Sequence, residues 1–320
     1  MNSKLVLICL VFMSSYSYAQ TCCSGGIPLS NNIGLPTLSK GSFQIGVNYD
    51  YNNLNTLNFE QEKLNDNSRL RITHSVLLNL NYSITNNISI EGLFTYVNQR
   101  RKITQFGNDN LDQTSGIGDA VVLANYRFQP KLIQNLELNI GIGAKVPIGS
   151  TTETSSEGIV LNADLQPGSN TWDVIYLMTL GKSFDFRPSF QVSGKFIYRA
   201  TGINNSYYGN ATYEFGNELL SYLSFSDLFI GFDTTMSPSL SIKYRNATND
   251  ELDGFLIDNT GGKWVSLIPN FAINITPNVT FSTKAELPIY SYVEGTQLTP
   301  TYRITTGVLI RLESNPVIFN

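Results

Sequence analysis

The stretch LRITHSVLLNLNYSI, residues 70–84, decides the fold. Its even-numbered positions are apolar apart from one His, whereas its odd-numbered positions are mostly polar. A period of two indicates a β-strand with one apolar face and one polar face. Soluble proteins use strands of about five or six residues, so a strand of this length is typical of a membrane protein. The apolar face carries Leu70, Ile72, His74, Val76, Leu78, Leu80, Tyr82 and Ile84.

Twelve segments share this alternation, and the connections between them alternate between short turns and long polar loops. An unpaired backbone amide costs several kcal/mol in hydrocarbon, so a chain crosses a bilayer only as helices or as a closed sheet. An even strand count with short turns on one side is the pattern of bacterial outer-membrane barrels. We therefore predict an all-β fold, a transmembrane antiparallel up-and-down β-barrel of about 12 strands. The segments are 42–51, 69–84, 88–98, 115–129, 135–147, 171–183, 188–200, 211–222, 228–244, 264–275, 279–290 and 301–312.

Aromatic residues give a second reason to prefer a barrel. With the first strand rising from the periplasm, outward aromatic side chains gather in two belts near the strand ends, where amphipathic rings suit the membrane interface. A soluble β-sandwich explains the alternation but neither these belts nor the strand length. The expected outer belt is Tyr49, Tyr51, Tyr96, Trp172, Tyr198 and Tyr302, and the expected inner belt is Phe43, Tyr82, Phe128, Phe190 and Phe281.

The amino terminus has the pattern of a secretory signal. Lys4 is followed by the apolar run 5–13, and Ala19 completes a small-residue cleavage site. We predict three parts: a signal peptide at 1–19, a periplasmic N-terminal segment at 20–41 that could enter the lumen as a plug, and a barrel domain at 42–320. The role of the adjacent Cys22 and Cys23, whether incidental thiols or a lipidation site, stays open. The protein is expected in the cell outer membrane, with long loops extracellular and both termini periplasmic.

Composition excludes several classes of function. The 320 residues are only 14% charged, below the roughly 25% of soluble domains. With 21 basic and 25 acidic residues, the chain has no excess of positive charge for nucleic acid. One His and three Cys leave little material for a metal site. His74 takes the outward parity, so we predict no catalytic residues, no enzyme activity, no metal and no cofactor.

Charged residues at the polar positions are expected to face the lumen, because a charge on the lipid side costs about 2–4 kcal/mol near the midplane. They either pair across the interior and brace the barrel, or line a water path and set its selectivity; we expect bracing from most and selectivity from a few. The candidates are Arg71, Glu91, Asp119, Lys145, Asp173, Lys195, Arg199, Lys284, Glu286 and Arg303.

Several strings resemble a family of outer-membrane transporters linked to the meta-cleavage pathway of phenol degradation. The resemblance covers most of 115–312, and the segment CCSGG at 22–26 resembles members from Bacteroidetes-type bacteria. It implies an outer-membrane barrel that passes small, often hydrophobic or aromatic, solutes. The strings are SGIGDA at 115–120, KVPIG at 145–149, LQPGS at 165–169, LPIY at 287–290 and EGTQL at 294–298.

Two functions follow as hypotheses. The first is a passive outer-membrane channel for a small solute that diffuses through a polar lumen. The second is a structural or surface-interaction barrel with a plugged lumen and no transport. The expected partners are outer-membrane lipids, the barrel-assembly machinery and, for the channel, the solute; no nucleic acid is expected.

Overall fold

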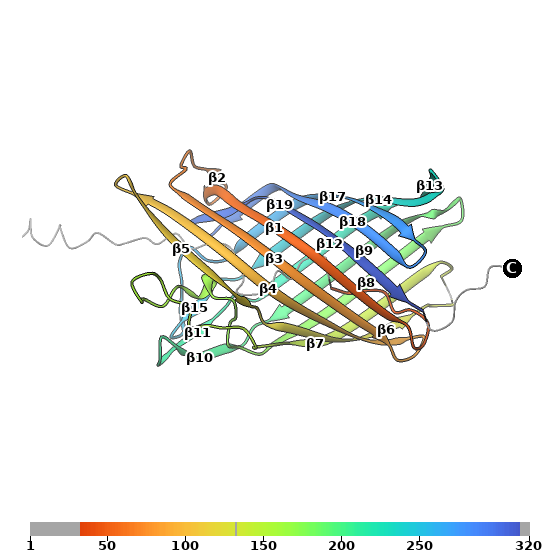
Figure 1. Ribbon diagram of the computed structural model, residues 1–320, viewed down its shortest axis with the longest axis horizontal. Helices are drawn as coiled ribbons and strands as arrows, with labels where there is room; N and C mark the ends of the chain where they lie inside the picture. The colour runs from red at the N-terminus through yellow and green to blue at the C-terminus, as the bar shows by residue number, and fades with distance from the viewer. Residues whose placement is uncertain (1–32, 132, 314–320) are drawn as a thin grey trace, which may run out of the picture.

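The computed structural model describes residues 33–131 and 133–313, and in it the strands form a closed, tilted barrel (Figure 1). Each ring strand pairs antiparallel with its two neighbours, and the ring closes where β1 pairs with β19. The predicted fold class is confirmed. The ring strands are β1 (Phe43–Phe59), β3 (Arg69–Ser83), β4 (Ile88–Gln105), β6 (Ala120–Phe128), β7 (Leu136–Val146), β8 (Asp173–Phe184), β9 (Arg187–Ala200), β12 (Glu218–Ser226), β14 (Thr234–Ala247), β17 (Gly262–Thr276), β18 (Val279–Val293) and β19 (Thr296–Leu312).

Shorter elements lie at the ends of the ring. At the long-loop end, β5 extends β4 as a hairpin, and four short strands form a separate sheet in the order β10-β11-β15-β16. At the short-turn end, β13 pairs with β14. The remaining elements are β2 (Glu62–Lys63), β5 (Asn108–Ile117), β10 (Ile203–Tyr207), β11 (Ala211–Glu214), β13 (Phe229–Gly231), β15 (Glu251–Leu252), β16 (Phe255–Leu256) and the single-turn η1 (Ala163–Leu165).

The eighth and ninth predicted segments are placed wrongly. The predicted strand 211–222 begins only at Glu218, because residues 211–214 belong to the small sheet, where Tyr213 and Phe215 are buried together. The predicted strand 228–244 begins at Thr234, and β13 folds back on it. Alternation alone could not separate a barrel strand from a short strand above the barrel, since both bury every second side chain.

The two faces of the barrel differ as the alternation predicts. Outward side chains such as Val47 and Tyr96 are 48% and 49% exposed, whereas the inward Arg71 is 1% exposed. No helix in the described part of the chain is long and apolar enough to span a bilayer. The predicted signal peptide, Cys22 and Cys23, and residues 20–32 of the predicted N-terminal segment lie outside the described residues.

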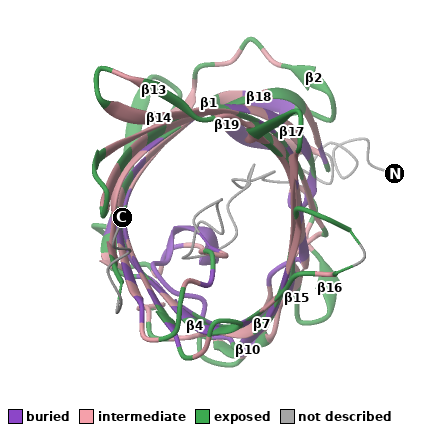
Figure 2. Ribbon diagram, turned by 90° about the vertical axis from the view of Figure 1, so that its right-hand side faces the viewer, coloured by how far each residue is buried: buried purple, intermediate pink, exposed green. Residues whose placement is uncertain are grey.

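The connection between β7 and β8 folds inward. The end-on view shows buried backbone inside the ring of strands (Figure 2). Residues 163–169 of this connection are buried, and η1 lies among them. The lumen therefore contains an inserted loop, which the sequence presented only as a long polar connection.

Candidate functional site in the barrel lumen

An ion network joins neighbouring strands on one side of the lumen. The Lys145 ammonium lies 2.7 Å from the Asp173 carboxylate and 3.6 Å from that of Asp119. The Arg199 guanidinium lies 3.9 Å from Asp173 and 3.5 Å from Glu218. All five side chains are nearly fully buried and alternate in charge sign. Removing one member of the network would leave the others as buried, unpaired charges, which is costly. The network therefore holds the neighbouring strands together.

The inserted loop is attached to this network. The Asp119 carboxylate accepts hydrogen bonds from the backbone N–H groups of Gly149 and Ser169, at 3.1 and 3.0 Å, and from the Ser169 hydroxyl at 2.6 Å. Lys145 donates to the Thr171 hydroxyl at 3.1 Å. Both ends of the loop are therefore anchored to charged groups of the wall.

The tip of the loop reaches β3, β4 and β5, further along the same side of the barrel wall. The Arg71 guanidinium of β3 lies 2.9 Å from the Asp164 carboxylate and also donates to Gln99. The Leu165 carbonyl accepts hydrogen bonds from the Gln99 amide at 3.3 Å and from the Thr114 hydroxyl at 2.7 Å. The loop thus crosses from β7 and β8 to β3, β4 and β5 and reduces the open section of the lumen.

A second group of charges lies where the first and last strands meet. The Arg303 Nε atom lies 2.7 and 2.9 Å from the Asp50 carboxylate oxygens. Lys243 donates to Glu286 at 2.9 Å, and Glu286 is the ladder partner of Arg303. Lys284 comes two residues before Glu286 on β18 and shares its inward parity. These candidates are brought together around β18.

Two further candidates bind the described end of the N-terminal segment. The Glu91 carboxylate accepts hydrogen bonds from the backbone N–H groups of Gly34, at 3.0 and 3.1 Å, and of Leu35, at 3.2 Å. Lys195 donates to the Ile33 carbonyl at 2.7 Å. Residues 33–42 therefore run against the inward faces of the strands. All ten candidate residues lie inside the barrel; none of these contacts tests their predicted effect on selectivity.

Part of the inner wall is apolar, which differs from the expected polar lumen. Its side chains come from β3, β4, β6, β8, β9, β12 and β17, and all are nearly fully buried. Ile33 packs into the same cluster. We call this surface the inner apolar wall; it consists of Leu77, Leu93, Val121, Leu123, Ile175, Leu177, Ile197, Leu220, Tyr222 and Ile268.

The sequence carried a weak signal for this wall. Leu77 interrupts the polar positions of β3 and stands between the apolar Val76 and Leu78. Gly141 on β7 also belongs to it, because an added Cβ would lie 3.2 Å from the Leu177 Cβ atom. A glycine there leaves room for the Leu177 side chain. The wall could have been found by marking the apolar residues at inward-facing positions. The adjacent strands would first have to be aligned by their height in the barrel.

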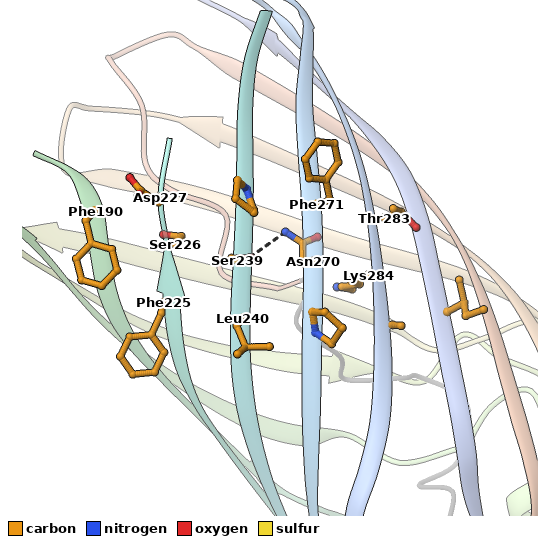
Figure 3. Close-up of a pocket in the computed structure, with 14 residues that line it drawn as sticks. Phe190, Phe225, Ser226, Asp227, Ser239, Leu240, Asn270, Phe271, Thr283 and Lys284 are labelled. Carbon is orange, nitrogen blue, oxygen red and sulfur yellow. Dashed lines mark hydrogen bonds between the residues drawn. The ribbon is translucent and has the colours of Figure 1, made fainter. Parts of the chain in front are cut away.

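The outer surface carries a groove of about 750 Å³ near the short-turn end (Figure 3). Asn270 and Lys284 have inward parity, whereas the groove's bulky side chains face outward. The Asn270 amide donates to the Ser239 hydroxyl at 3.0 Å beside it. Because the groove is apolar and faces the lipid side, its surface suits contact with a lipid acyl chain better than passage of a solute. The bulky lining residues are Phe190, Phe225, Pro238, Leu240, Pro269 and Phe271.

His74 lies on the outward face, as expected. Its Nδ1 atom is 2.6 Å from the Tyr49 hydroxyl, and its ring lies 5.3 Å from that of Tyr51. These contacts place it beside Tyr49 and Tyr51, two residues of the predicted outer belt. Among the described residues, no group of three or more His, Cys, Asp or Glu could hold a metal ion.

No family model and no curated protein matches the sequence. The fold is similar to that of an outer membrane channel from Pseudomonas putida F1, with a TM-score of 0.66 and 15% identity over 89% of this chain and 100% of that one. The beta domain of the Bordetella autotransporter BrkA gives a TM-score of 0.48, with 10% identity over 85% of this chain and 99% of that one. A monoaromatic hydrocarbon channel, CymD, gives 0.37, with 10% identity over 86% and 89%. The first of these shows that the chain has the fold of an outer-membrane channel.

Proposed function

We propose that this protein is an outer-membrane channel that lets a small solute with an apolar or aromatic body cross passively. The inner apolar wall is the observation that carries the proposal. In a lumen that served only ions or sugars, ten apolar and aromatic side chains in contact with one another would stabilise the fold but would not help to bind the solute. Once residues that cover it, such as Ile33, move away, this wall would give an apolar solute a favourable surface inside a barrel that otherwise holds charges.

Tyr222 adds a polar contact to this wall. Its hydroxyl is buried and has no hydrogen-bond partner among the described residues. A buried hydroxyl without a partner costs free energy, so a solute that carries a hydroxyl or carbonyl group would be bound more tightly here. The channel needs no energy source, since the solute moves down its gradient.

The charged candidates divide into two roles under this proposal. The network of Asp119, Lys145, Asp173 and Arg199 braces the wall and holds the inserted loop. Lys284 and the other charges around β18 would set the charge preference of the water path. Residues 33–42 would act as a plug that narrows the path. The long loops would be extracellular and both termini periplasmic, with outer-membrane lipids around the barrel and the barrel-assembly machinery inserting it.

A structural or surface-interaction barrel is the second candidate. The inserted loop and residues 33–42 both occupy the lumen, and Ile33 already packs against the inner apolar wall. If the two segments never move, solutes cannot pass and the extracellular loops would carry the function.

Uptake of an apolar aromatic dye separates the two candidates. Gram-negative cells that express the protein should admit N-phenyl-1-naphthylamine faster than cells without it. Leu177→Asn should remove this gain, because it makes the inner apolar wall polar, while Leu223→Asn on the outward face should keep it. Equal dye entry with and without the protein, together with no conductance in planar bilayers, would leave the plugged barrel as the better account.

A further inference from the structure

Ile33 is bound by the barrel wall in the way that a small solute would be. Its side chain packs into the buried cluster of the inner apolar wall. Its carbonyl oxygen accepts a hydrogen bond from the Lys195 ammonium at 2.7 Å. Ile33 precedes β1 and is not itself part of the ring of strands. The wall therefore offers, at one place, a surface for an apolar group and a cationic donor for an oxygen atom.

Tyr222 adds a second donor beside Lys195. On β12 it is the ladder partner of Lys195 on β9 and of Lys243 on β14. Directly opposite residues have Cβ atoms about 4.5–5.5 Å apart on one face of a sheet, and the Lys243 ammonium lies 5.9 Å from the centre of the Tyr222 ring. The Tyr222 hydroxyl is buried and has no hydrogen-bond partner among the described residues. It can therefore donate to a second oxygen atom of a ligand held by Lys195.

The charges around Tyr222 favour an anion. Ion pairs and electrostatic interactions link seven charged side chains here, four cations and three carboxylates, which leaves one excess positive charge. The adjacent ion network does not change this excess, because with Arg245 it holds three cations and three carboxylates. An uncompensated buried charge is costly, so one monoanion would be favoured. The seven are Lys195, Lys243, Lys284, Arg303, Asp50, Glu91 and Glu286.

We propose that this site binds the carboxylate of an apolar or aromatic acid, which takes the place of Ile33. The inference rests on the proposed channel function and names the class of its solute. The ring or alkyl chain would pack on the inner apolar wall, where the Ile33 side chain now lies. One carboxylate oxygen would accept a hydrogen bond from the Lys195 ammonium and the other from the Tyr222 hydroxyl. The start of residues 33–42 then competes with the solute for one site.

This competition explains why the charge of the solute matters. The Ile33 carbonyl is a neutral amide oxygen, so a neutral solute would only exchange one such oxygen for another at Lys195. A carboxylate gains more, because hydrogen bonds between ionised partners are roughly twice as strong as those between neutral ones. Displacement of Ile33 is therefore favourable for an acid and close to balanced for its neutral analogue.

A binding measurement tests the site without transport. The probes are para-fluorobenzoate and para-fluorobenzamide, which share the ring and differ in charge, and fluorine NMR follows each as the purified full-length protein is added in detergent. The acid should bind about tenfold or more tightly than the amide, since it alone forms a charge-assisted hydrogen bond. Micelles without protein correct for partition of the probes. Equal affinities would overturn the proposal.

Tyr222→Phe separates binding from a structural role. The Tyr222 hydroxyl has no partner among the described residues, so its loss should leave the unfolding midpoint unchanged, whereas affinity for para-fluorobenzoate should fall about tenfold. Tyr176→Phe, on the outward face of β8, is the matched control and should keep the affinity. An unchanged affinity in Tyr222→Phe would overturn the site as built here.

Lys195→Gln should remove the preference for the acid over the amide, because it replaces the ammonium by a neutral donor. Arg101→Lys, in a pair with Asp112 between β4 and β5, is the control for a changed cation outside the site. The heat-modifiable gel shift checks folding of both variants. A preference that persists in folded Lys195→Gln would overturn the proposal.

Dye entry distinguishes this inference from the proposed function. In cells that express the protein, para-fluorobenzoate should slow entry of N-phenyl-1-naphthylamine, and para-fluorobenzamide should not. Dye entry that the acid does not slow would overturn the carboxylate site and leave a channel for neutral solutes standing. A wild type that admits no dye would overturn the channel function and, with it, the assigned solute.

Discussion

The Glu91 carboxylate accepts hydrogen bonds at both of its oxygens from the backbone N–H of Gly34. A buried side chain of the wall thus holds the N-terminal segment through its backbone. The contact does not depend on which side chains the segment carries. Hydrogen bonds to charged groups contribute roughly 1.5–3 kcal/mol each. Glu91, together with Lys195, therefore attaches the start of residues 33–42 near the inner apolar wall.

Glu91→Ala should release the start of this segment, residues 33–35, and widen the lumen there. Loss of the carboxylate removes the bonds to Gly34 and Leu35, so we expect the open state to become about tenfold or more populated, in line with a loss of at least 1.4 kcal/mol. Single-channel recording should show larger or longer openings. Glu137→Ala is the control, since Glu137 lies at the exposed short-turn end, 4.0 Å from Arg127. Identical traces for the two variants would contradict the anchoring role.

Lys145→Met should destabilise the barrel strongly. It leaves the carboxylates of Asp119 and Asp173 buried without their shared cation, which costs about 3–5 kcal/mol. Lys102→Met breaks the pair with Asp109, at 2.7 Å but with side chains 43% and 54% exposed, and should cost about 1 kcal/mol or less. The midpoint of urea unfolding in detergent, followed by the gel shift, compares the two. A similar midpoint for both would show that the network does not brace the wall.

Gly143→Ala should be poorly tolerated. An added Cβ would collide with the Val122 carbonyl oxygen and lie 2.7 Å from the Leu123 Cδ2 atom, and overpacking of this kind costs about 1–3 kcal/mol or more. Gly92→Ala is the matched control, because its Cβ would make an ordinary 3.4 Å contact with Phe94. Unfolding midpoints should fall for the first variant only. An unfolding midpoint of Gly143→Ala equal to that of the wild type would mean that the wall relaxes around the added methyl group.

The small sheet above the barrel should loosen as pH rises. The Asp250 carboxyl accepts hydrogen bonds from the Tyr213 hydroxyl at 2.6 Å and the Gly216 N–H at 2.8 Å, yet burial raises its pKa above 3.8. The folded state then favours the neutral form. This stabilisation is complete below the unfolded pKa and is lost as pH rises through the folded one.

Hydrogen exchange measures this effect. The protection factor of the Gly216 N–H, corrected for the intrinsic exchange rate, should fall from pH 4 toward pH 7, and Asp250→Asn should flatten the dependence. Protection that rises with pH in the wild type would reverse the assigned sign.

Strand positions were predictable because lipid and lumen impose opposite preferences on alternate residues. β3 was predicted within a residue, at 69–84 against Arg69–Ser83. The same rule failed at Tyr213 and Phe215, whose alternation comes from packing beneath the loops. Pro238 lies in β14 just beyond the last β12 pair, at Ser239, so its missing N–H breaks no bond to β12.

The lumen was harder to predict than the wall. Parity placed all ten candidate charges inside, because hydrocarbon excludes them. It could not show that Asp164, from a loop, would pair with Arg71, 93 residues away. It also treated Leu77 as an exception, since the inner apolar wall is visible only when several strands are aligned in height. Contacts between distant segments are set by tertiary packing, which no local period encodes.

Asp50 and Arg303 pair across 253 residues of chain, between the first strand and the last. The ring therefore cannot close until nearly the whole polypeptide has been synthesised, and joining such distant ends is entropically costly and slow. Until then the edges of β1 and β19 present unsatisfied amides, which are templates for aggregation. Biogenesis must keep these two edges apart from other chains, and the speed of that final step would limit how much of the protein a cell can make.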